Sequence, residues 1–338
     1  MRYKIKVYSI QEYGKRIDAQ GRPHQEDSLF PEHGKATGAD RLFLVCDGMG
    51  GHDAGEVASA TVCEAMSKYI LKQQPDADGA FTAEDLNAAV SAAFDALDIR
   101  DTGAEKKMGT TMTALKLHDR GYTAAHIGDS RIYHIRPGAT ADTTRIVFRT
   151  EDHSLVNDLV RIGELTPDEA KTFSRKNVIT RAMQPAMERR CKADIHESAD
   201  IRAGDYFYLC TDGMLENTDD ANLRWIFSAE GGSDDKKVSM LKRATDDNRD
   251  NHTAIIVHVV EVIDPLPVEE DTTIVSRPAT ATPATRKSNG RRGPGRLAVI
   301  VALVVLAVVV ALAGMVLWHS TQTQDKSATV APLPAATR

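Results

Sequence analysis

The chain has 338 residues, and its 42 Lys and Arg against 48 Asp and Glu give a net charge of -6 at pH 7. This balance excludes a strongly basic nucleic-acid binder, whereas 42% apolar residues suffice for one sizeable core or two domains. The start of the chain shows no basic segment followed by an apolar run, so no signal peptide is expected.

The first predicted elements are one strand and two helices. Residues 41–47 (RLFLVCD) form a short apolar run that ends in an acid and predict a strand. Residues 55–73 carry apolar side chains at helical spacing and predict a helix. Residues 82–97 predict a second helix, in which Thr82 and Asp85 fit a capping box.

Short strand-like segments dominate the rest of the large N-terminal part. Four of them follow in quick succession and predict a meander of antiparallel strands, at residues 111–118, 122–129, 131–136 and 144–149. Two further strands are expected at residues 205–212 and 253–263. Three helices are expected at residues 154–162, 167–173 and 234–247. Because the strands come largely in runs, the order favours an α+β fold over a doubly wound parallel sheet.

The four cysteines carry little functional information. They are widely spaced and form no CxxC pair, which makes a zinc cluster or a disulfide framework unfavourable. We expect reduced thiols in a cytoplasmic core, since free Cys is among the most buried residue types.

The C-terminal part changes character twice. Residues 1–263 form the expected catalytic domain, and residues 264–296 lose apolar periodicity and fill with Pro, Thr, Ala and Arg, which predicts a disordered linker. Residues 297–317 are apolar throughout and, at about 1.5 Å per residue, match the roughly 30 Å of a bilayer core. The alternative, a buried core helix, fits poorly because this stretch is apolar on every face.

The flanking charges predict the orientation of this transmembrane helix. The basic residues before it are Arg286, Lys287, Arg291, Arg292 and Arg296, whereas only Lys326 and the distant Arg338 follow it. An excess of Lys and Arg marks the cytoplasmic side. We therefore expect a single-pass protein of the inner (cytoplasmic) membrane, with its catalytic domain in the cytoplasm and residues 318–338 as a short extracytoplasmic tail.

Acidic residues recur at the ends of the predicted strands. Asp47, Asp129 and Asp212 each end an apolar run, and Asp250 comes just before the last strand. Strand ends are rigid, so they can hold several carboxylates at one point, and oxygen-only ligands suit Mg²⁺ or Mn²⁺. Glycines after Asp47 allow a sharp turn that could bring a carbonyl, such as that of Gly48, near a metal. The alternative is that each Asp-Gly pair is a solvated turn.

Eight short motifs go further than composition. In order along the chain they are residues 22–27 (RPHQED), 47–52 (DGMGGH), 109–111 (GTT), 128–131 (GDSR), 152–154 (DHS), 177–181 (NVITR), 211–213 (TDG) and 250–253 (DNHT). Together they resemble the motifs of the PPM family, the type 2C metal-dependent serine/threonine protein phosphatases, in its bacterial form. The resemblance runs over nearly all of residues 1–262.

The resemblance implies an α-β-β-α sandwich, in which two packed antiparallel sheets carry helices on their outer faces. It also implies a centre of two Mn²⁺ or Mg²⁺ ions. Asp47 would bridge both ions, Asp212 and Asp250 would complete the first site, and the Gly48 carbonyl would serve the second. The remaining acids implied at this centre are Glu26 through water, Asp27 in the surrounding shell, and Asp129 at a third, weaker ion.

The implied reaction is hydrolysis of phosphoserine and phosphothreonine in proteins by a metal-bridged water, which reverses a cognate Ser/Thr kinase. Two metals would activate the water and neutralise the phosphoryl group. Arg22 is the candidate for gripping phosphate oxygens, with a surface salt bridge as the alternative. His52 is the candidate general acid, with a loop histidine of no chemical role as the alternative.

Two other readings of the sequence remain open. A catalytically silent phospho-binding signalling module on the same fold would be expected to lack an acid, whereas Asp47, Asp212 and Asp250 are all present. A membrane structural protein whose soluble domain docks partners would not need the full set of strand-end carboxylates. The expected partners are phosphoproteins, a cognate kinase and the membrane, and no nucleic acid.

Overall fold

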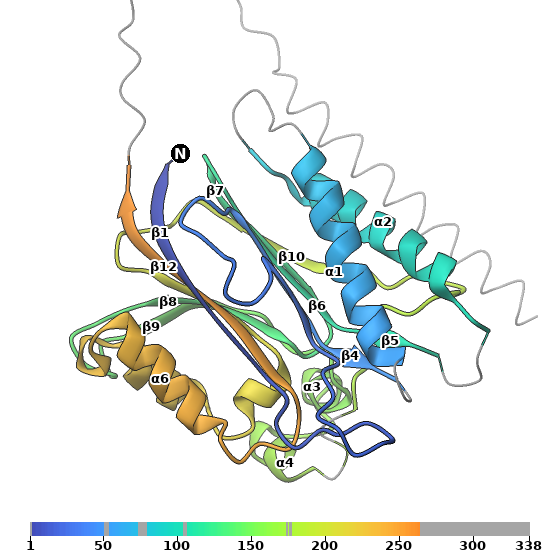
Figure 1. Cartoon of the computed structure of the whole chain (residues 1–338). Coiled ribbons are helices and arrows are strands. Elements are labelled where there is room, and N and C mark those ends of the chain that lie inside the picture. The colour runs from blue at the N-terminus through green and yellow to red at the C-terminus, as the bar shows by residue number, and fades with distance from the viewer. Residues whose placement is uncertain are drawn as a thin grey trace, which may run out of the picture. The chain divides into compact units, whose positions relative to one another are not determined.

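Two antiparallel five-stranded sheets lie face to face in the computed structural model, with helices on their outer faces (Figure 1). The structure describes residues 2–50, 54–73, 80–103, 107–173, 175 and 178–263. His52 and the predicted linker, transmembrane helix and tail at residues 264–338 lie outside these residues. Among the helices that the structure does describe, none is long and apolar enough to cross a bilayer.

The first sheet has the strand order β1-β12-β11-β8-β9. Its strands are β1 (Tyr3–Glu12), β12 (His252–Val262), β11 (Tyr206–Cys210), β8 (Arg131–Arg136) and β9 (Arg145–Arg149). All its neighbouring strands pair antiparallel.

The second sheet has the order β10-β7-β6-β3-β2. Its strands are β10 (Asp194–Ser198), β7 (Gly121–Ile127), β6 (Met112–His118), β3 (Leu42–Cys46) and β2 (Ser28–Phe30). A separate two-stranded ribbon joins β4 (Gly48–Met49) to β5 (Gly109–Thr110).

The central strands are apolar on both faces because each sheet is covered on both sides. Successive side chains of a strand point to opposite faces, and in β3 Leu44 packs toward helices whereas Phe43 and Val45 pack toward the first sheet. In β11, Phe207 and Leu209 meet β3 across the sandwich. The unbroken apolar runs of the sequence are therefore strands buried on two sides.

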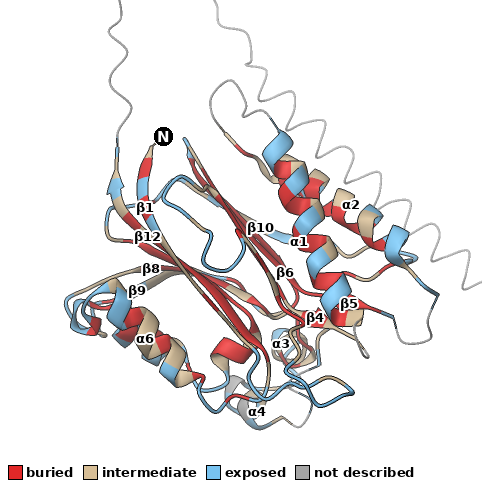
Figure 2. Cartoon of the chain, viewed as in Figure 1, coloured by how far each residue is buried: buried red, intermediate tan, exposed pale blue. Residues whose placement is uncertain are grey.

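Helices cover each outer face. On the second sheet lie α1 (Ala54–Lys72) and α2 (Ala83–Arg100), and on the first lie α5 (Asp220–Phe227) and α6 (Asp234–Ala244). Each shows a buried stripe toward its sheet and an exposed outer side, which is plain for α1 and α6 (Figure 2). The predicted capping box of α2 is confirmed, since Thr82 and Asp85 exchange side-chain to backbone hydrogen bonds.

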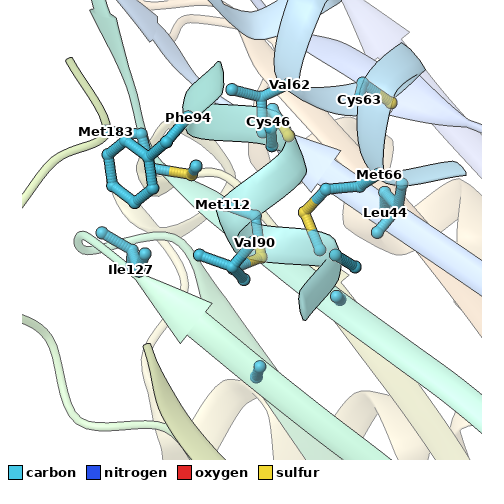
Figure 3. Packing of buried hydrophobic residues seen from close by; sticks show 14 of the residues in the cluster. Leu44, Cys46, Val62, Cys63, Met66, Val90, Phe94, Met112, Ile127 and Met183 are labelled. Atoms are coloured by element: carbon cyan, nitrogen blue, oxygen red, sulfur yellow. The ribbon is translucent and has the colours of Figure 1, made fainter. Parts of the chain in front are cut away.

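The core under α1 and α2 is built from both helices and the second sheet. Figure 3 shows Leu44 and Cys46 among Val62 and Met66 of α1 and Phe94 of α2. Leu44, Cys46, Val62 and Met66 are fully buried. All four cysteines are free thiols, as expected from their spacing.

Two short helices lie at one end of the sandwich. They are α3 (Leu155–Arg161) and α4 (Pro167–Thr172), near the ribbon of β4 and β5 (Figure 1). Short 3-10 turns occur at η1 (Asp212–Leu215) and η2 (Ala229–Gly231).

The predicted meander of four strands is confirmed for its outer two pairs, since β6 pairs with β7 and β8 with β9, but wrong for its middle pair, since β7 and β8 do not pair. Strands β6 and β7 belong to the second sheet, whereas β8 and β9 belong to the first. The chain changes sheet at Gly128, whose φ of 106° lies in the left-handed region and where a Cβ would come within 2.5 Å of Thr111. Sequence spacing alone could not show that this turn crosses between layers.

Several elements were missed from the sequence. They are the edge strands β1, β2 and β10 and the short helix α5. Edge strands have one unpaired side and carry polar residues, so their apolar signal is weak. The last predicted helix also ends earlier, at Ala244 instead of residue 247.

Candidate metal centre

The antiparallel topology brings the predicted strand-end acids to one end of the sandwich. Asp47 directly follows β3, and Asp129 follows β7, which runs parallel to β3 because both flank β6 in antiparallel pairing. Asp212 follows β11, and Asp250 precedes β12, its antiparallel partner. The charges of Asp212, Asp129 and Asp250 all act on Asp47, so the four acids lie together at one end of the sandwich.

A cleft of about 730 Å³ opens at this end. Its lining includes the acids Asp129, Asp152, Asp212, Glu216 and Asp250, together with Arg131 and Arg249. Three of the predicted metal residues thus share one cleft wall. Asp47 lies close enough to these acids for its carboxyl and that of Asp212 to influence each other's pKa.

Crowding and burial raise the pKa values of these carboxyls. Burial, with the charges of Asp27 and Asp212, raises the pKa of Asp47 well above its ordinary value. Burial, with Asp212 and Asp152, raises the pKa of Asp129 to about 7. Burial and Asp250 also raise the pKa of Asp212, although its interaction with Asp47 lowers it in part. The protein alone therefore favours shared protons here in place of several full negative charges.

The donor set fits hard divalent cations. Asp129 Oδ1 and Asp212 Oδ1 are buried and have no hydrogen-bond partner in the structure. Buried carboxylate oxygens without a partner are costly unless a cation meets them. In the described residues no three His, Cys, Asp or Glu side chains are already arranged as a finished ligand set. The acids are close enough to perturb one another, but they need side-chain adjustment to surround an ion.

Arg16 is one reason that the ligand set is not finished. Its guanidinium lies between two of the predicted acids, with Nη2 at 3.0 Å from Glu26 and Nε at 3.0 Å from Asp250. It neutralises part of the negative charge that a metal would otherwise neutralise. Nothing in the sequence pointed to Arg16, because it lies outside the motifs and reaches the centre only through the turn held by the Ile17–Pro23 bridge.

Gly48, whose carbonyl is predicted to serve a metal, lies in tightly packed backbone between β3 and α1. Its N–H donates to the Glu26 carbonyl at 3.1 Å, and a Cβ at this position would come within 2.2 Å of the Gly55 carbonyl oxygen and 2.4 Å of the Glu26 carbonyl oxygen. Only glycine allows three backbone segments to approach so closely.

A polar scaffold holds the acid-bearing loops in place. Asn251 accepts a hydrogen bond from Glu26 N–H at 2.8 Å and donates to the carbonyls of Tyr13 and His24. Asp27 is buried, and its Oδ2 accepts from Thr211 Oγ1 at 3.1 Å. Burial, with Asp212 close by, raises the pKa of Asp27 to about 8. Asp27 is thus tied to the loop that carries Asp212, and its place in the shell around the metals stays a prediction.

The two predicted catalytic side chains outside the acid cluster differ in their placement. Arg22 does not line the cleft; its Nε donates to Asp18 Oδ2 at 2.7 Å, and its side chain is 73% exposed. This is the surface salt bridge that the sequence left open as the alternative. His52 lies outside the described residues.

A half-buried ion pair also lines the cleft. Arg131 binds Asp152 through two parallel contacts of 2.6 and 2.7 Å. The next residue, His153, accepts a hydrogen bond from Gly128 N–H through Nδ1 at 3.1 Å. The turn that carries Asp129 is therefore tied to the segment that leads into α3.

Known proteins resemble the chain in sequence and in fold. The profile of the family described as Protein phosphatase 2C matches residues 14–239. Serine/threonine protein phosphatase PstP of Mycobacterium tuberculosis is 34% identical over 209 residues, which cover 60% of this chain and 36% of that protein. Protein phosphatase PhpP of Streptococcus pneumoniae is 29% identical over 248 residues, which cover 72% of this chain and 94% of that protein.

Solved structures share the sandwich. The crystal structure of the catalytic domain of serine threonine protein phosphatase PstP, in complex with 2 manganese ions, matches with a TM-score of 0.58 and 30% identity. The match covers 76% of this chain and 99% of that one.

Proposed function

Since this chain belongs to the protein phosphatase 2C family, we propose that it hydrolyses phosphoserine and phosphothreonine in proteins, with Mn²⁺ or Mg²⁺ as cofactor. The observation that carries the proposal is the convergence of Asp47, Asp129, Asp212 and Asp250 at one end of the sandwich. Two of these acids present buried oxygens without partners. Such oxygens suit a hard cation.

Asp47, Asp212 and Asp250 would hold the metals, with the Gly48 carbonyl and Glu26 completing the centre. Asp129 would serve a third, weaker ion. When bound, Mn²⁺ or Mg²⁺ supplies charge neutralisation of the phosphoryl group and lowers the pKa of water. Asp27 and Asn251 hold the ligand loops through the hydrogen bonds described above.

Two arginines near this centre would have different roles. Arg16 must leave Glu26 and Asp250 before these acids can turn fully toward a cation. Arg22 would leave Asp18 to orient phosphate oxygens with its planar fork. His52 would deliver a proton to the leaving serine or threonine oxygen.

Turnover of two substrates tests the proposal. The chain is expected to hydrolyse p-nitrophenyl phosphate and a phosphothreonine peptide only with added Mn²⁺ or Mg²⁺, and Asp47→Asn is expected to reduce turnover to background. Asp142→Asn, which changes an exposed carboxylate away from the cleft, serves as the matched control. A folded, Mn²⁺-loaded chain without turnover on either substrate would favour the catalytically silent phospho-binding module.

The C-terminal segment extends the proposal to the membrane. We propose that residues 297–317 anchor the chain in the inner membrane, with residues 1–263 as the cytoplasmic catalytic domain, residues 264–296 as linker and residues 318–338 outside. The support is the unbroken apolar run and the basic residues before it. Tethering would raise the effective concentration of membrane-proximal phosphoproteins and of a cognate Ser/Thr kinase.

Membrane fractionation tests the anchor. The full chain is expected to remain in the membrane pellet after an alkaline wash, and deletion of residues 297–317 is expected to release it. Protease added outside intact spheroplasts should leave residues 1–263 uncut. Cleavage of the catalytic domain under these conditions would reverse the proposed orientation.

A further inference from the structure

A second groove lies beside the candidate metal centre, between α5 and α6. Its volume is about 670 Å³. Trp225 is 46% exposed here although it is a large aromatic side chain. The buried Ile226 and half-buried Met240 extend the apolar surface. An aromatic with one open face beside aliphatic side chains is typical of an interaction surface.

The groove is also positively charged. Lys236 and Arg243 line it, both are exposed, and neither side chain has an ion pair to another described residue. No Asp or Glu is among the described residues that line the groove. This is notable in a chain of net charge -6, and it contrasts with the five acids that line the neighbouring cleft.

The groove and the cleft share one residue, Asn217. Its Nδ2 donates to Asn248 Oδ1 at 2.7 Å, and Asn248 Nδ2 donates to the carbonyl of Gly213 at 2.5 Å. Gly213 directly follows Asp212. The two sites therefore meet at a hydrogen-bonded wall, and an extended polypeptide that leaves the cleft over Asn217 enters the groove.

We propose that this groove binds an acidic segment of the phosphoprotein substrate, beside its phosphorylated residue. The proposal rests on the proposed phosphatase function. An apolar side chain of the segment would pack on Trp225, and its carboxylates would lie beside Lys236 and Arg243. Charge complementarity favours this occupant, because two exposed cations in a groove whose described lining holds no acid attract a segment of opposite charge.

Two phosphothreonine peptides that differ only in the flanking segment test the proposal on the full chain. The first peptide carries Glu-Leu-Glu both before and after the phosphothreonine. The second carries Lys-Leu-Lys at the same two places. The acidic peptide is expected to have a kcat/KM about tenfold higher, mainly through KM. The double change Lys236→Glu with Arg243→Glu should reverse this preference and leave turnover of p-nitrophenyl phosphate unchanged, because that substrate is too small to reach the groove.

Arg224→Glu is the matched control. Arg224 precedes Trp225 in α5 and is exposed, but it lines a different depression, with Thr144 and Arg145. This variant should keep the preference for the acidic peptide. Equal kcat/KM for both peptides in the unchanged chain, or an unchanged preference in the double variant, would overturn the proposal.

Binding separates this proposal from the proposed function. If neither p-nitrophenyl phosphate nor any peptide is hydrolysed, the phosphatase function fails, and fluorescence anisotropy of the unphosphorylated acidic peptide still tests the groove. A Kd about tenfold weaker in the double variant would support the groove, and no binding to the unchanged chain would overturn it.

Other occupants give other results. A dimer that the double variant converts to monomer in sedimentation would assign the groove to a second copy of the chain. Stronger peptide binding after Glu269, Glu270 and Asp271 are all changed to Ala would assign it to the chain's own acidic segment. Either result would overturn the proposal of a substrate segment.

Discussion

Asp129→Asn is expected to stabilise the metal-free chain at pH 8. Asp129 is half-buried, its Oδ1 has no hydrogen-bond partner, and the charges of Asp212 and Asp152 oppose its ionisation. Asparagine has nearly the same shape without the charge. The change therefore removes an unfavourable charge that a bound cation would offset.

The size of the effect follows from the pKa of Asp129. That pKa is about 7 in the fold and 3.8 for the free side chain, and each pKa unit corresponds to about 1.4 kcal/mol. Ionised Asp129 thus costs at most about 4 kcal/mol. Partial exposure and the buried amide of the new Asn reduce the expected gain to about 2 kcal/mol.

The pH dependence has a definite sign. A carboxyl whose pKa is raised in the fold makes the folded state bind more protons than the unfolded state, so its contribution to stability falls as pH rises from about 4 to about 7 and is constant above. The advantage of the Asn variant should therefore be small near pH 4 and reach its full size near pH 8.

Urea unfolding of the full chain in EDTA, followed by circular dichroism, measures the effect. Asp142→Asn, at an exposed carboxylate, should change the free energy of unfolding by less than about 0.5 kcal/mol. With saturating Mn²⁺ the advantage of Asp129→Asn should shrink or reverse. If the variant is as stable as the unchanged chain or less stable at pH 8 in EDTA, the reasoning from charge crowding is refuted.

Three further changes test other parts of the structure. Arg16→Ala removes the guanidinium that pairs with two predicted metal acids, so the Mn²⁺ affinity should rise by roughly three- to tenfold in calorimetric titration; weaker Mn²⁺ binding would contradict a competing role. Leu44→Ala opens a cavity in the fully buried core under α1 and should cost about 2–4 kcal/mol in urea unfolding, whereas Leu71→Ala, 60% exposed, should cost little. Asp205→Ala removes the 2.9 Å partner of His134 Nε2 together with two contacts from Arg136, and should cost about 3 kcal/mol; a loss below about 1 kcal/mol would show that this network is dispensable.

The sequence alone predicted the central strands and the acids at their ends. Continuous apolar runs such as residues 42–46 and 206–210 are strands buried on both faces, and this pattern is local to each segment. Asp47 and Asp129 meet because β3 and β7 both flank β6 antiparallel and so run in the same direction, and Asp212 and Asp250 meet because β11 and β12 pair antiparallel. The sequence predicted that strand-end carboxylates converge on a cation, and the family resemblance implied Asp47, Asp212 and Asp250 as neighbours there.

Tertiary structure alone decided which sheet each strand joins. The turn at Gly128 carries the chain from β7 in one sheet to β8 in the other, and no local pattern distinguishes this crossing from a hairpin. The edge strands β1 and β10 form because their partners are in place, since their own residues are half polar.

The same division holds at the candidate site. Residue types and spacing predicted that carboxylates gather at the strand ends, because each acid is fixed by the strand beside it. Only the folded chain placed Arg16 between Glu26 and Asp250, turned Arg22 toward Asp18, and set Trp225 beside Lys236. These side chains are long or come from separate elements, so their positions depend on which segments pack together, and that is decided by the whole core.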